Sequence, residues 1–453
     1  MSNNHRQTAE LSAFTSALSY ARIPEPALER ARLCLLDYLG AALAGSRSRE
    51  AGLARAFVAR VGGNPQASII GTDLKTSVPL AALANGVAGH VYEVDDAHRY
   101  ATGLHPGATV IPAVLAAAEY CDSKWGDLLT AIVAGYEVAG RVGRAINPSH
   151  RYRGFHSTGT VACLGAAAGV ARILGLGAKE TAWALGLAGS MAGGLFEFLQ
   201  DGSMSKLLHA GHAAAAGVTA ALMAAEGFTG PSTVLEGKEG FCRAFADEYN
   251  LELLTQGLGE RFEMENVYFK RHAACGHSFA AIDAALELRR QLQGKEKEIR
   301  RVTVKTYRAA AVLDKKKPET TREAKFSLPF VIALAIIKGR AGYFDFVPAN
   351  LQDQEVLALA AKVDVSEDAE INSTFPQKRT AVLEIEMQNG DKLAHSVDIP
   401  RGMPENPLSK EEVVEKFKSL AGIILSEVEV VKIAGEVLGA ENDGKVSSLL
   451  SLI

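Results

Sequence analysis

The sequence predicts a mainly α-helical protein that contains one smaller α+β domain. Residues 1–266 read as successive helices, residues 267–399 carry strand patterns between helices, and residues 400–453 return to helix. A chain of 453 residues is too long for one ordinary domain, so its length agrees with this division.

The first region is predicted to consist almost entirely of helices. Pro26 suits the first turn of a helix that places Leu33, Leu36 and Leu39 near one face. Further helices are expected at 78–91, 109–121, 126–146, 158–174, 179–198, 207–226 and 238–248. Many of these segments are rich in Ala and Gly, which lets helix axes approach closely. A short extended piece is expected at 67–71.

Strand patterns begin after residue 266. Residues 300–307 alternate apolar and polar side chains, and residues 379–400 read as a hairpin whose Asn389 and Gly390 suit a type I′ turn. Helices are expected in the same domain at 278–294, 326–338 and 353–362.

The tail is predicted to return to helix. Ser409 and Glu412 have the spacing of a capping box at the start of one helix, and a second helix is expected at 426–438. If these helices pack back on the first region, the α+β domain is an insertion.

Composition favours a soluble protein of the reducing cytoplasm. The net charge of -4 gives no case for a nucleic-acid or membrane partner. The five cysteines form no CxxC pair, and the polar N-terminus lacks the apolar core of a signal peptide. Residues 207–225 carry no formal charge, but they include His209 and His212 and much Ala and Gly, which favours a buried helix over a membrane span.

Candidate chemistry concentrates in four short segments rich in His and small residues. Nine of the eleven histidines lie between His90 and His277. Histidine is the side chain that titrates nearest neutrality. Its clustering beside acids and a lysine suits proton transfer on a small anionic molecule.

In the first segment, residues 91–109, Asp95 and Asp96 precede His105 in a loop before a predicted helix. His105 is a candidate acid or base, and Asp95 can orient it and raise its pKa. The alternative for the two acids is structural, because an Asp in such a loop can cap the amides of the helix.

The second and third segments each start a helix. His156 precedes a helix N-terminus, which favours an anion, although a buried structural histidine is the alternative. Lys206 opens a very apolar helix and shares a face with His209. Lys206 can bind a carboxylate or act as a base, and the alternative is a lysine that reaches to solvent from a helix end.

In the fourth segment, Lys270, Arg271 and His277 crowd the expected domain junction, where ligand sites are frequent. Such a basic cluster can hold a polycarboxylate, although a solvated linker position is the alternative for Arg271. Cys275 lacks the Cys–His–Asn order of a thiol enzyme. The sequence has no HxH, HExxH or glycine-rich nucleotide motif, so we expect no metal and no nucleotide cofactor.

These segments resemble the MmgE/PrpD family, which includes 2-methylcitrate dehydratases, cis-aconitate decarboxylases and an iminodisuccinate epimerase. The resemblance extends from about residue 8 to the end. It rests on ANGVAGHVYEVDD with HPGATVIPA, GFHSTGTV, MSKLLHAGHAAAAGV, CGHSFAAIDAAL and AKFSLPF, which occur in this order.

The resemblance implies a large all-helical domain formed by both chain ends (1–266 and 400–453) with an inserted α+β lid (267–399). It also implies a homodimer and catalysis without a metal or an iron–sulfur cluster. The family's active-site positions correspond to Asp95 or Glu93, His105, His156, Lys206 and Lys270. We further expect substrate contacts from Asp96, Tyr152, His209, Arg271 and His277. The chain departs from the family at Phe279, where a histidine is frequent, and His277 is a candidate replacement.

Our leading hypothesis from the sequence is a metal-independent hydro-lyase that removes a proton next to a carboxylate and dehydrates a small di- or tricarboxylic acid such as 2-methylcitrate. His105 and His156 form the expected acid/base pair, with Asp95 orienting His105, while Lys206 and Lys270 hold carboxylates. The alternatives are a dicarboxylate epimerase, a cis-aconitate-type decarboxylase and a catalytically inactive carboxylate-binding protein, which Phe279 alone would favour.

Overall fold

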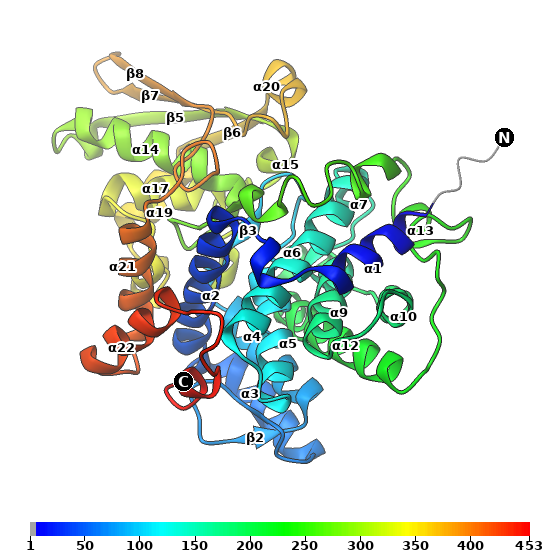
Figure 1. The fold of residues 1–453 in the computed structure, drawn as a ribbon. Helices are drawn as coiled ribbons and strands as arrows, with labels where there is room; N and C mark the ends of the chain where they lie inside the picture. The colour runs from blue at the N-terminus through cyan, green and yellow to red at the C-terminus, as the bar shows by residue number, and fades with distance from the viewer. Residues whose placement is uncertain (1–5) are drawn as a thin grey trace.

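The computed structural model describes residues 6–453 and is mainly helical, with a small mixed sheet in the C-terminal region (Figure 1). Residues 1–5, part of the polar N-terminus noted above, lie outside the described residues. The helices of the first region are α1 (Gln7–Ala17), α2 (Glu25–Ser46), α3 (Arg49–Val61), α4 (Val78–His90), α5 (Gly107–Tyr120), α6 (Trp125–Ile146), α7 (Ser149–Tyr152), α8 (Ser157–Thr160), α9 (Ala162–Ile173), α10 (Ala178–Ser190), α11 (Phe198–Asp201), α12 (Ser205–Ala225) and α13 (Phe241–Phe245). Its short strands are β1 (Ala67–Ser68), β2 (Lys75–Thr76) and β3 (Ala97–His98), and β3 pairs with β4 (Val267–Tyr268) at the start of the next region.

The remaining chain alternates helices and strands before a helical tail. Its elements are α14 (Phe279–Leu292), β5 (Ile299–Thr306), α15 (Arg308–Ala311), α16 (Thr321–Ala324), α17 (Leu328–Lys338), α18 (Pro348–Leu351), α19 (Gln354–Ala361), β6 (Val363–Glu367), α20 (Ala369–Ser373), β7 (Ala381–Met387), β8 (Lys392–Val397), α21 (Lys410–Ala421), α22 (Glu427–Leu438) and α23 (Ser447–Leu450).

Each helix predicted in the first region has a counterpart, but three differ in extent. The segment predicted at 158–174 is divided into α8 and α9, and the one at 238–248 is only the five-residue α13. The segment at 179–198 ends as α10 at Ser190, before Gly193 and Gly194, and Gly194 has a φ of 150° that L-residues rarely adopt. The helices α1 and α3 and the four-residue helices α7 and α11 were not predicted.

Small residues bring the central helices close together, as predicted. Where α4 crosses α12, a Cβ atom added to Gly86 would lie 2.9 Å from the Cα atom of Gly211. Within residues 6–453, α12 alone is long and apolar enough to cross a membrane by length and composition, and 61% of its most apolar window is buried in the protein. The packing of α12 against α4 and α9 agrees with the expected buried helix.

The sheet has the order β6-β5-β7-β8, with β5 and β6 parallel and the other pairs antiparallel. The predicted β7–β8 hairpin is present, but its turn is not type I′, because of its central residues only Gly390 has a positive φ (89°). Instead, the Met387 amide donates to the carbonyl of Asp391, which closes a longer turn. The strand β6 was not predicted, since it follows α19 directly and has only two apolar residues.

The tail packs back on the first region. In Figure 1 the red C-terminal helices lie beside the blue α2, and a Cβ atom added to Gly40 of α2 would lie 3.3 Å from Phe417 of α21. One apolar core joins the first region to α21 and α22, while most residues of a second core lie between 268 and 403. The domain boundaries at 266/267 and 399/400 themselves stay a prediction.

Candidate active site

A cavity lies between the helical region and the segment after residue 267. It leaves about 600 Å³ not filled by protein atoms, part of it open to solvent. The polar side chains that line it come from both parts: Glu93, His98, His105, Arg151, His156, Lys206, Tyr268, Cys275, His277 and Arg379. The site predicted from four separate segments is therefore assembled at this one place.

Glu93 lines the cavity and lies between two lysines. Its carboxylate accepts from Lys206 Nζ on one oxygen and from Lys270 Nζ, at 2.9 Å, on the other. All three side chains are buried. Burial alone would raise the pKa of Glu93, but Lys206 and Lys270 hold it well below its usual range. Glu93 is therefore ionised and keeps both ammonium groups in place.

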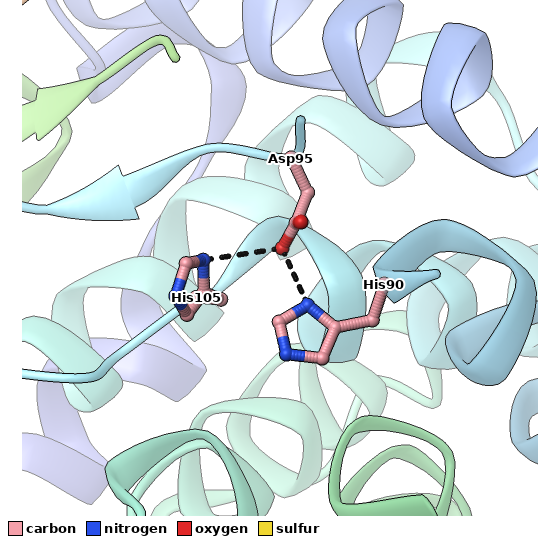
Figure 2. A group of neighbouring side chains, drawn as sticks. All are labelled: His90, Asp95 and His105. Atoms are coloured by element: carbon pink, nitrogen blue, oxygen red, sulfur yellow. Dashed lines mark hydrogen bonds and ion pairs between the residues drawn. The ribbon is translucent and has the colours of Figure 1, made fainter. Parts of the chain in front are cut away.

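Asp95 binds two histidines with one oxygen. His90 Nδ1 lies 2.8 Å and His105 Nδ1 lies 3.2 Å from Asp95 Oδ2, as Figure 2 shows. His90 Nε2 lies 2.9 Å from Lys206 Nζ. Because an ammonium group only donates, His90 Nε2 accepts and His90 Nδ1 carries the proton toward Asp95. Asp95, His90, Lys206 and Glu93 thus form one continuous buried network.

His105 presents its other nitrogen to the cavity. Its Nδ1 lies within reach of two acceptors, Asp95 and the Asp96 carbonyl at 2.9 Å, so the proton of the neutral ring lies on Nδ1. Nε2 is left as an unprotonated base. Burial and the nearby Lys270 lower the pKa of His105 to about 4, although Asp95 opposes this shift. The expected contact between Asp95 and His105 is present.

His156 lies just before α8 and contacts a second histidine. Its Nδ1 lies 3.0 Å from His209 Nδ1, so one ring donates to the other. Burial and the charge of Lys206 lower the pKa of His156 well below its usual value. His156 is fully buried, whereas His209 is only partly buried and does not line the cavity. His209 therefore contacts His156 rather than the space for a substrate.

Two arginines supply positive charge that no carboxylate of residues 6–453 neutralises. Arg151 lies over the ring of Phe196, with its Cζ 3.6 Å from the ring centre. Arg379 donates to Tyr268 Oη at 3.2 Å and to the Arg99 carbonyl at 2.8 Å, and its buried Nε has no partner among the described residues. A cavity with two such guanidinium groups suits an anion with more than one carboxylate.

His277 lines the cavity and Phe279 does not. His277 Nδ1 lies 2.8 Å from Tyr307 Oη. Phe279 starts α14 and is fully buried, with its ring against Tyr268 and His272. The departure from the family pattern thus places a packing residue at 279, while the adjoining turn still directs a histidine to the cavity.

Four other predicted substrate contacts lie away from the cavity. Asp96 accepts from the Gly107 amide at 2.8 Å and from Tyr136 Oη at 2.7 Å, so it caps α5 as the structural alternative proposed. Tyr152 is half exposed, with Arg308 over its ring. Lys270 and Arg271 line a different cavity beside α21, and Lys270 reaches the site only through Glu93.

Sequence reasoning missed Arg379 and Tyr307, and it gave Arg151 and His90 no direct role. Arg151 was visible only as a neighbour of Tyr152, and His90 belongs to the family-like ANGVAGHVYEVDD stretch. Arg379 and Tyr307 carry no local signal. They lie beside β7 and β5, far along the chain, and the fold brings Arg379 to the cavity and Tyr307 to His277.

His90, Asp95 and His105 also offer three donor atoms within 4.8 Å of one another, which is the spacing of a metal site. Lys206 and Lys270 lie close by, and a cation placed there would be repelled by both ammonium groups. The nitrogen–oxygen distances of 2.8 and 3.2 Å are those of hydrogen bonds. The residues therefore fit a proton-bearing network better than a metal centre.

The fold and the cavity together describe a helical protein with a smaller α+β part, and titratable side chains from both line one cavity. The chain belongs to the MmgE/PrpD family: its N-terminal domain matches residues 9–254 and its C-terminal domain matches residues 272–440. The family resemblance noted from the motifs is confirmed.

Three relatives illustrate the range of the family. The chain is 29% identical to the cis-aconitate decarboxylase-like protein oryM of Aspergillus oryzae, over 98% of this chain and 97% of the relative. It is 28% identical to the cis-aconitate decarboxylase of Aspergillus terreus, over 98% and 95%. The 2-methylcitrate dehydratase of Escherichia coli is 28% identical over 64% of this chain and 62% of the relative.

Proposed function

We propose that this protein is a decarboxylase of a small unsaturated tricarboxylate of the cis-aconitate type. The sequence alone favoured a dehydratase and kept such a decarboxylase as an alternative, and we now rank the decarboxylase first. One observation carries the proposal. The two Aspergillus relatives that match over almost their whole length are a cis-aconitate decarboxylase and a protein named as similar to one. The dehydratase of Escherichia coli matches over less than two thirds of either chain.

The cavity supports this chemistry. Arg151 of the helical region and Arg379 of the α+β part would bind carboxylates of the substrate. One carbon–carbon bond then breaks, and the carboxylate leaves as carbon dioxide. The electron pair of the broken bond shifts through the double bond to the carbon next to another carboxylate, where nearby cations stabilise the negative charge. That carbon finally takes one proton, and we assign the donation to His156, which His209 can reprotonate from the more exposed side.

Dehydration of a 2-methylcitrate-like hydroxy acid is the second candidate. It is favoured by the unprotonated Nε2 of His105, which has the form of a base that removes a proton next to a carboxylate. A homodimer, a cytoplasmic location and the absence of nucleic-acid and membrane partners stay predictions.

The test is proton NMR in deuterium oxide, with the purified protein and separate samples of cis-aconitate, 2-methylcitrate, citrate and amino-dicarboxylates. We expect cis-aconitate to lose carbon dioxide and to give a five-carbon dicarboxylate with a terminal methylene group and one deuteron. Faster turnover of 2-methylcitrate would establish the dehydratase instead. Hydrogen exchange without net reaction would indicate an epimerase, and no change in any sample would favour an inactive binding protein.

A further inference from the structure

The turn at Tyr92, Glu93 and Val94 is held in an uncommon conformation. Glu93 has a φ of 57°, in the left-handed region that residues with a side chain seldom adopt. Such a backbone persists only where its surroundings hold it. This conformation directs the Glu93 carboxylate between Lys206 and Lys270.

Two further lysines bind the carbonyl groups on either side of Glu93. Lys325 Nζ donates to the Tyr92 carbonyl at 2.7 Å. Lys416 Nζ donates to the Val94 carbonyl and, at 2.6 Å, to Asp37 Oδ1. The turn is thus bound through its carboxylate by one pair of lysines and through its backbone by another.

Lys325 is in an environment that disfavours a charged amine. It is 5% exposed, and its side chain donates to a backbone carbonyl rather than to a carboxylate of residues 6–453. Burial lowers its pKa to about 7, and Lys270 and Lys206 act in the same direction, against Glu93. Its ammonium group is compensated by the Tyr92 carbonyl and by the rings of Tyr92 and Phe346, whose centres lie 5.3 and 5.5 Å away.

The two lysines come from different parts of the chain. Lys325 lies between α16 and α17, and Lys416 lies on α21 in the C-terminal tail. Since Glu93 follows α4 of the first region, its turn is a point where all three parts of the molecule meet through charged side chains.

We propose that Lys325 and Lys416 are positioning residues: each holds one carbonyl beside Glu93, and together they keep its carboxylate between Lys206 and Lys270. The proposal rests on the proposed function, because it assumes that this placement of Lys206 serves a reaction in the adjoining cavity. Neither lysine touches the cavity itself.

The kinetic test uses Lys325→Met and Lys416→Met with the substrate that the wild type turns over. A displaced catalytic group commonly costs about 10- to 100-fold, so we expect kcat to fall by that amount with little change in KM. Lys416→Arg keeps a donor for the Val94 carbonyl and should recover most of the activity. The matched control is Lys418→Met on the same helix. Lys418 forms an ion pair with Glu415 away from the Glu93 turn, so this substitution should leave kcat unchanged.

A double-mutant cycle separates positioning from a general structural role. If Lys325 acts through Glu93, then Lys325→Met should lower kcat far less in a Glu93→Gln background than in the wild type. Equal losses in both backgrounds would overturn the proposal.

Crystal structures of the two Met variants give a result that does not depend on turnover. We expect Glu93 to leave the left-handed region and its carboxylate to lose contact with Lys206 or Lys270. An unchanged Glu93 in both variants would contradict the proposal even if the protein proves to be a decarboxylase. If the wild type turns over no carboxylate, the proposed function fails, while the crystal structures still decide whether the lysines position Glu93.

Discussion

At the scale of single residues, neighbours rather than residue type set the chemistry of each histidine. His90 and His105 both carry their proton on Nδ1, because Asp95 accepts from them. His156 has no carboxylate partner within residues 6–453 and contacts His209 instead. The same side chain therefore serves as a link in a buried network, as a base facing the cavity, or as one half of a histidine pair.

We expect His156→Ala and Lys206→Ala each to lower kcat by about 10²–10⁴-fold, since each removes a group that handles a proton or holds developing charge. Steady-state kinetics with the substrate identified by NMR measures the loss, and circular dichroism checks that the fold is intact. His212→Ala is the control, because His212 is exposed on the same helix as Lys206. Near-wild-type turnover in both site variants would refute the assignment of this cavity.

At the scale of elements, helix ends recognisable in the sequence place residues that support the site from outside the cavity. The capping box of Ser409 and Glu412 starts α21, which presents Lys416 to the Glu93 turn. Ser426 and Glu429 form the same box on α22, which carries no residue of the site. The two helices therefore offer a matched comparison of one capping motif in two positions.

We expect Ser409→Ala to lower the free energy of unfolding by about 1 kcal/mol, because the Glu412 amide loses its acceptor. Ser426→Ala should cost a similar amount for the same reason. Urea unfolding measures both losses. A cost below about 0.3 kcal/mol in both variants, smaller than typical caps contribute, would show that these boxes do not stabilise the tail.

At the scale of the whole molecule, buried histidines link folding to pH. Burial is the main cause that lowers the pKa of both His105 and His150 to about 4. An unfolded chain binds these protons near pH 6.5, whereas the folded protein does so only near pH 4. The stability that these neutral histidines contribute is therefore fully present above about pH 6.5, and it is lost as the pH falls toward 4.

We expect each of these histidines to contribute a slope of about 1.4 kcal/mol per pH unit between pH 6.5 and 4. Urea unfolding at several pH values should show a shallower slope in His150→Gln than in the wild type, whatever its stability at neutral pH. The exposed His212→Gln should keep the wild-type slope. Equal slopes for wild type and His150→Gln would mean that His150 does not titrate as described.

Much of the fold could be predicted because its signals are local. Apolar periodicity and capping residues lie within one element, so the Pro26 helix, the tail helices and the hairpin were found with nearly correct bounds. Among the helices that were not predicted, α3 has only two fully buried residues, and α1 buries mostly Thr and Ser beside Leu11. Their place depends on the surfaces they cover rather than on a strong pattern of their own.

Part of the site could likewise be predicted from the sequence, and part could not. The motifs and the family resemblance that they carry identified Glu93, His105, His156, Lys206 and His277, all of which line the cavity. The domain matches confirm the family. Only the tertiary structure decided which of their neighbours face a substrate: it placed Asp96 at a helix cap and brought Arg379 to the cavity from the β7 side. The reason is physical. The residue type fixes the functional group of a side chain, but its partners, charge state and access to the cavity depend on segments hundreds of residues away.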